Sequence, residues 1–127
     1  MQDFTIPSAG STPEIISNWA AGRLVMRGDS YPENSFEFFQ PVIDWVERFL
    51  VEADRPLQVD LFLLYLNTSS IRSLMEILDL LEAAHRADKP VRVSWYYDLE
   101  NERLAELAEE FREDCTFPFH ILTLAEE

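Results

Sequence analysis

Four polar residues, from Asn67 to Ser70, directly follow an apolar run at 61–66, and an amphipathic pattern begins after them. This order predicts a buried strand that ends at the N-terminus of a helix. The first backbone N–H groups of a helix have no partner within it, and the helix dipole favours negative charge there. The hydroxyls of Thr68, Ser69 and Ser70 could therefore cap the helix, bind an anion or accept a phosphoryl group.

Capping is the commonest of these roles, and a single acceptor on Asn67 or Thr68 would satisfy it. Four polar side chains exceed that need, and α/β proteins place functional loops at the carboxyl ends of their strands. The segment 28–35 supplies further donors: Ser30, Tyr31 and Asn34. One hypothesis is therefore an anion site, in a small-anion-binding protein or an enzyme, formed by the 28–35 loop and the helix N-terminus at Thr68–Ser70.

The other reactive side chains do not indicate catalysis. His85 and His120 do not lie at metal-ligand spacing from another good ligand. Cys115 follows two acidic residues, whose charges disfavour a thiolate. The carboxylates at 100–113 follow the pattern of a solvated helix face, and no glycine-rich phosphate loop is present. We therefore expect no enzyme activity, catalytic residue, cofactor or metal.

The composition excludes several classes of partner. Among 127 residues, Asp and Glu number 24 and Lys and Arg number 10, which gives a formal net charge of −14. Such a surface repels nucleic acid and anionic lipid, so we expect neither as a partner. There is one cysteine, no apolar stretch near the about 20 residues that span a bilayer, and no signal-like start. We predict a cytoplasmic, bacterial protein.

The apolar periodicities predict a hairpin followed by alternating helices and strands. In chain order, the predicted elements are strand 14–17, strand 23–27, helix 36–50, strand 57–66, helix 71–81, strand 91–97, helix 104–111 and strand 117–123.

This order predicts a single α/β domain over residues 1–127, with one mixed β-sheet and packed helices. Strand 57–66 is apolar on both alternating faces, which predicts that it is covered on both sides. We expect a loop at 28–34 that caps the first helix, and a kink or a fresh first turn at Pro41.

Two strings are specific: Gly-Asp-Ser-Tyr-Pro-Glu-Asn-Ser at 28–35 and Leu-Tyr-Leu-Asn-Thr-Ser-Ser at 64–70. Shorter matching stretches lie at 11–13, 42–46, 80–85 and 109–114. On these residues the chain resembles the SiaC family of bacterial regulatory phosphoproteins, over nearly its whole length. The family is similar in fold to the anti-sigma factor antagonist (STAS) domains, in which a Ser or Thr at a strand-to-helix junction is phosphorylated.

The resemblance implies that Thr68 is the phosphoacceptor. A SiaB-like protein kinase would modify it, and a SiaA-like, metal-dependent protein phosphatase would restore it. The unphosphorylated form would bind and activate a SiaD-like diguanylate cyclase, and so control cyclic di-GMP, aggregation and biofilm formation. Phosphorylation at Thr68 would switch this activation off.

Simple electrostatics agrees with such a switch. A phosphate adds about −1.5 to −2 charges. The N-terminus of a helix tolerates this negative charge, but a partner docked there would have to pack against a dianion. We expect few cations near Thr68 on so acidic a chain, and a partner that presents Lys or Arg. The predicted partner-binding residues are Asp29, Ser30, Tyr31, Glu33, Asn34, Asn67, Thr68, Ser69 and Ser70.

Overall fold

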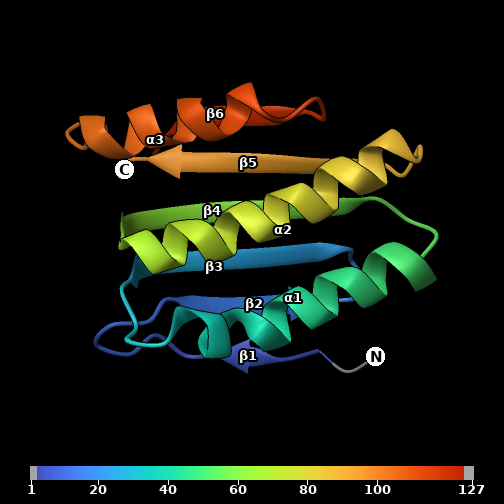
Figure 1. Cartoon of the computed structure of the whole chain (residues 1–127), viewed down its shortest axis with the longest axis horizontal. Coiled ribbons are helices and arrows are strands. Elements are labelled where there is room, and N and C mark those ends of the chain that lie inside the picture. The colour runs from blue at the N-terminus through green and yellow to red at the C-terminus, as the bar shows by residue number, and fades with distance from the viewer. Residues whose placement is uncertain (1–2, 125–127) are drawn as a thin grey trace.

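In the computed structural model, which describes residues 3–124, a six-stranded mixed β-sheet carries three helices on one face (Figure 1). The elements are β1 (Thr5–Ile6), β2 (Glu14–Asn18), β3 (Arg23–Ser30), α1 (Ser35–Glu52), β4 (Leu57–Leu66), α2 (Thr68–Arg86), β5 (Val91–Tyr97), α3 (Glu102–Glu113) and β6 (Phe119–Thr123). The strands lie in chain order from β1 to β6. Neighbours are antiparallel up to β3 and parallel from β3 to β6. The predicted α/β class with a mixed sheet is confirmed.

The core lies between the sheet and the helix layer. Each helix connects two neighbouring parallel strands, and crossovers of one hand place all three helices on the same face. Trp45 and Phe49 of α1 and Ile77 of α2 are almost fully buried there. Trp95 of β5 extends the core toward α3, where its ring lies 5.6 Å from that of Phe111. The helix layer therefore holds α3 next to the carboxyl end of β5.

Among residues 3–124 no helix lies over the opposite face of the sheet, so the prediction that strand 57–66 is covered on both sides is wrong. On this face Phe62 stacks on Tyr96 with ring centroids 4.4 Å apart, and the Arg27 guanidinium lies 4.8 Å from the Phe62 ring. Asp60 is buried beside Arg23, at 2.7 Å. The side chains of this face pack against one another on the sheet surface. An apolar residue that packs in this way gives the same sequence pattern as one buried under a helix.

The predicted hairpin is confirmed, because β2 and β3 pair antiparallel. Its turn requires Gly22, which has φ +66° and where a Cβ would lie 2.3 Å from the carbonyl oxygen of Pro56. Strand β3 is longer than predicted and continues through Ser30 across a bulge between Gly28 and Asp29. Asp29 and Ser30 are therefore strand residues, and the predicted loop begins only after them.

Helix α1 runs from Ser35 to Glu52 with Pro41 inside it, so the expected fresh first turn at Pro41 is wrong. Pro41 and the residue one turn before it, Glu37, are exposed, and water can satisfy the carbonyl group that loses its N–H partner. The cap is Asn34, whose side-chain oxygen accepts a hydrogen bond from the backbone N–H of Glu37 at 3.1 Å. The loop before α1 thus caps it as predicted.

Candidate functional site

The two specific sequence strings meet at the carboxyl edge of the sheet. Strands β3 and β4 are parallel neighbours, and Ser30 at the end of β3 pairs with Leu66 at the end of β4. The backbone N–H of Asn67 then donates to the carbonyl oxygen of Ser30 at 3.0 Å. This register brings the segment 28–35 against the first turn of α2.

Asn67 is the cap of α2. Its side-chain oxygen accepts from the backbone N–H of Ser70 at 2.8 Å, and its amide nitrogen donates to the carbonyl oxygen of Pro32 at 3.4 Å. Of the two capping residues that the sequence allowed, the structure uses Asn67. Thr68 is consequently the first residue of the helix and is not needed to cap it.

The two serines that follow are engaged in a hydroxyl cluster between α2, β3 and α1. The hydroxyl of Ser70, which is fully buried, lies 2.7 Å from that of Ser30 and 3.3 Å from that of Ser35. The hydroxyl of Ser69 lies 2.7 Å from that of Ser35 and donates to the side-chain oxygen of Asn67 at 3.2 Å. Both serines therefore hold the two segments together.

Thr68 differs from its two neighbours. It is exposed, and its hydroxyl has no hydrogen-bond partner among residues 3–124. A phosphoryl acceptor must offer its hydroxyl oxygen to another protein's active site. Of the three hydroxyls at this junction, the Thr68 oxygen is the one that can do so without breaking a bond inside the protein.

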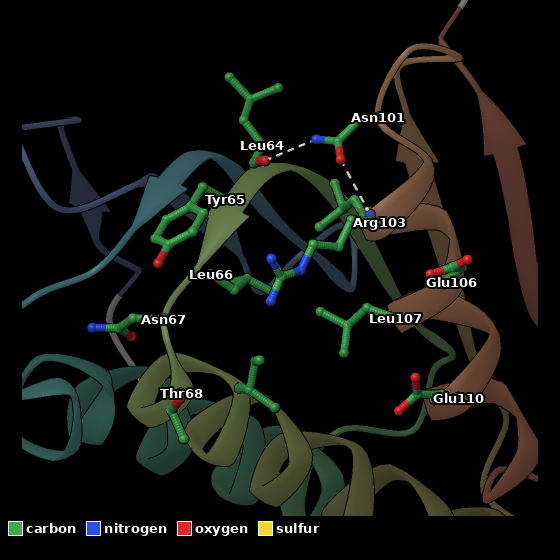
Figure 2. Close-up of a pocket in the computed structure, with 12 residues that line it drawn as sticks. Leu64, Tyr65, Leu66, Asn67, Thr68, Asn101, Arg103, Glu106, Leu107 and Glu110 are labelled. Carbon is green, nitrogen blue, oxygen red and sulfur yellow. Dashed lines mark hydrogen bonds between the residues drawn. The ribbon is translucent and has the colours of Figure 1, made fainter.

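A groove of about 420 Å³ lies beside Thr68, between the start of α2 and α3 (Figure 2). Asn101 fixes its far wall, because its oxygen accepts from the Leu104 N–H at 3.2 Å and its amide donates to the Leu64 carbonyl at 3.0 Å. The groove is lined by Leu64, Tyr65, Leu66, Asn67, Thr68, Ile71, Asn101, Arg103, Leu104, Glu106, Leu107 and Glu110.

The α3 side of this groove was not predicted as part of the site. The acid-rich pattern of 100–113 is typical of a solvated helix face, and it carries no local signal that links Arg103 to Thr68. Arg72 lies one helical turn after Thr68 and is also exposed. Arg72 and Arg103 both lie on this part of the surface, where few cations were expected.

The remaining predicted residues lie on the β3 side of Thr68. Tyr31 is half-exposed, its hydroxyl donates to the Gly10 carbonyl oxygen at 2.8 Å, and its ring meets that of Tyr65 edge-on. Asp29 and Glu33 are exposed. The proposed anion donors Ser30, Tyr31 and Asn34 are each hydrogen-bonded to protein groups. Each of these groups is therefore already engaged within the protein, and the anion-site hypothesis gains no support.

Exposed apolar side chains gather on the same edge of the sheet. The large ones that follow the carboxyl ends of β3, β4 and β5, or lie close to them, are Tyr31, Phe36, Leu64, Tyr65 and Leu99, each at least 45% exposed. Apolar groups gathered on a surface with polar neighbours are typical of a protein-binding site. The edge around Thr68 therefore has the composition of an interface.

The other reactive groups stay apart from this edge. Burial and the nearby carboxylates of Glu82 and Asp114 raise the pKa of the Cys115 thiol to about 11, which makes it a poor nucleophile. Among residues 3–124, no three His, Cys, Asp or Glu side chains gather as a metal site. No helix in the described part of the chain is long and apolar enough to cross a membrane.

Comparison with known proteins gives one consistent result. Residues 6–124 match the family model described as SiaC family regulatory phosphoprotein. An uncharacterized protein of Pseudomonas aeruginosa strain UCBPP-PA14 is 65% identical over 121 residues, which cover 95% of this chain and 96% of that protein.

Two solved structures have the same fold and a similar sequence. Apo-SiaC from Pseudomonas aeruginosa is 63% identical with a TM-score of 0.92, over 96% of this chain and 99% of that one. A chain in the crystal structure of diguanylate cyclase SiaD in complex with its activator SiaC, from the same organism, is 64% identical with a TM-score of 0.93, over 96% of this chain and all of that one. The chain therefore belongs to the SiaC family of regulatory phosphoproteins.

Proposed function

We propose that this protein is a phosphorylation-switched activator of a diguanylate cyclase, and that Thr68 is the phosphoacceptor. In its unphosphorylated form it binds the cyclase and raises the production of cyclic di-GMP. Phosphorylation of Thr68 releases the cyclase. The protein acts by binding and not by catalysis. A SiaB-like protein kinase adds the phosphate and a SiaA-like, metal-dependent phosphatase removes it.

The observation that carries this proposal is the contrast among the three hydroxyls. Ser69 and Ser70 have hydrogen-bond partners within the protein, whereas the Thr68 hydroxyl has none among residues 3–124 and Thr68 lines the groove. The family is one of phosphoproteins, and a SiaC from Pseudomonas aeruginosa activates a cyclase in a complex with it. A modification at Thr68 would change the charge of an exposed edge without disturbing the core.

The exposed apolar edge is the surface that we assign to the cyclase. It carries exposed aromatic and aliphatic groups near the carboxyl ends of β3, β4 and β5, on the same edge of the sheet as Thr68, and these groups gain free energy when a partner buries them. A phosphate of about −1.5 to −2 charges on Thr68, at this edge, would have to be desolvated on binding. Loss of binding therefore needs no change of fold, because burial of the phosphate adds a desolvation cost that the unphosphorylated form does not have.

The direct test is to phosphorylate the protein with the cognate kinase and map the modified residue. We expect one added phosphate, on Thr68, in the wild type and in Ser69→Ala, and none in Thr68→Ala. Binding of each form to the cyclase is then measured by calorimetry. Phosphate on Ser69 or Ser70 with Thr68 unmodified would refute the assignment, as would equal cyclase affinity of the two forms.

A further inference from the structure

Arg103 is the one basic side chain among the groove-lining residues. It extends from α3 into the groove toward the end of β4 and the start of α2, where Thr68 lies (Figure 2). The ion pairs within residues 3–124 involve Arg23, Arg48, Arg86 and Arg112, and Arg103 is in none of them. The guanidinium is therefore available to an anion that arrives on the opposite wall.

The groove itself offers Arg103 only weaker partners. Glu106 and Glu110 line it from the same helix as Arg103, and each is an exposed single charge. A phosphate carries about twice that charge and three acceptor oxygens, which match the two-pronged geometry of a guanidinium. A phosphate on Thr68 would therefore compete well for Arg103.

We propose that Arg103 is the intramolecular receptor for a phosphate on Thr68, and that this ion pair bridges α3 to the start of α2 across the groove. The inference rests on the proposed function, because it takes Thr68 as the modified residue. Phosphorylation then does more than add charge to a surface. It occupies the groove and holds its two walls together, so the partner loses both the groove and the guanidinium.

The bridge and simple charge repulsion predict opposite effects of removing Arg103. If the phosphate acts only by its charge, loss of a nearby cation leaves the phosphate less neutralised, and phosphorylation should weaken cyclase binding as much as before or more. If the phosphate acts through the bridge, Arg103→Gln should reduce the ratio between the affinities of the unphosphorylated and phosphorylated forms. The ratio is taken within each variant, so any contact between Arg103 and the cyclase that both forms make cancels, and a contact made only by the unphosphorylated form counts as part of the switch.

The ion pair itself is tested by ³¹P NMR on protein that carries phosphothreonine at position 68, inserted during synthesis so that no kinase is needed. A neighbouring guanidinium favours the dianion, so the second pKa of the phosphate should be about 0.5–1 unit lower in the wild type than in Arg103→Gln. Arg103→Lys should keep part of this difference. Arg112→Gln, on the same helix but outside the groove, should leave the phosphate pKa unchanged.

Equal phosphate pKa values in the wild type and Arg103→Gln would overturn the proposal. The proposal would also be overturned if Arg72→Gln raised the phosphate pKa and Arg103→Gln did not. The receptor would then be Arg72, one turn along α2 from Thr68. Circular dichroism checks that each variant is folded. The proposed function fails separately, if the kinase does not modify Thr68 or if the phosphothreonine protein still binds the cyclase fully. The NMR comparison still reports on Arg103 in either case.

Discussion

Removal of the Ser70 hydroxyl should destabilise the protein far more than removal of the Thr68 hydroxyl. The hydroxyls of Ser30 and Ser70 are both buried, at 0% exposure, and lie 2.7 Å apart. Ser70→Ala leaves the Ser30 hydroxyl buried without its partner, which costs about 1–3 kcal/mol. Thr68→Ala removes an exposed hydroxyl from a helix that Asn67 caps, so the change should stay within about 0.5 kcal/mol.

The double variant Ser30→Ala with Ser70→Ala separates the hydrogen bond from other effects of the substitutions. Since it removes both partners, no buried hydroxyl of this pair is left unsatisfied, and its cost should be less than the sum of the single variants by at least about 0.5 kcal/mol. Asn67→Ala should cost about 0.5–2 kcal/mol through the lost cap.

Urea unfolding followed by circular dichroism gives the free energy of unfolding of the wild type and the five variants. In thermal unfolding, each kcal/mol corresponds to a shift of about 4 °C in Tm. A loss in Thr68→Ala as large as that in Asn67→Ala would refute the assignment of the cap. Additive costs for Ser30→Ala and Ser70→Ala would show that their hydroxyls do not interact.

Three further predictions follow from the site and its surroundings. Thr68→Asp should weaken cyclase binding less than phosphate does, because it adds one charge and not about two. Tyr31→Ala should also weaken cyclase binding. Equal affinities of the wild type and both variants, measured by calorimetry at low and high salt, would contradict this prediction. Because the pKa of Cys115 is raised to about 11, its alkylation at pH 8 should be roughly 100-fold slower than that of an ordinary cysteine; a normal rate would show that the thiol is not desolvated. Hydrogen bonds from the backbone and hydroxyl of Thr116 lower the pKa of Glu82 from 4.5 to about 2. The ionised Glu82 carboxylate therefore stabilises the folded protein above pH 4.5, and this contribution is lost as the pH falls toward 2. Glu82→Gln should accordingly destabilise the protein at pH 7 and differ less from the wild type as the pH falls, and a difference that is constant in acid unfolding would contradict this.

Local patterns were sufficient to predict most elements of the fold. The apolar run at 57–66, the polar cluster after it and the hairpin of strands 14–17 and 23–27 all depend on neighbours in sequence, and each was found where predicted. Coverage of β4 was predicted wrongly because Phe62 is apolar yet packs sideways against Tyr96 on the open face. An apolar residue gives the same sequence signal in both environments.

The site could be predicted only in part. The string at 64–70 identifies the strand-to-helix junction, but the bond between Ser30 and Ser70 joins residues 40 positions apart. The groove likewise depends on the sheet order, which puts α3 beside the start of α2. No local pattern encodes these long-range contacts, so neither the role of Ser70 nor the position of Arg103 could be predicted.

The most direct test of the proposed switch is the rate of cyclic di-GMP synthesis by the cyclase in the presence of each form of this protein. The unphosphorylated wild type and Thr68→Ala should both raise the rate, whereas protein phosphorylated on Thr68 should leave it at the basal level until a phosphatase removes the phosphate. Equal activation by the phosphorylated and unphosphorylated forms would contradict the account.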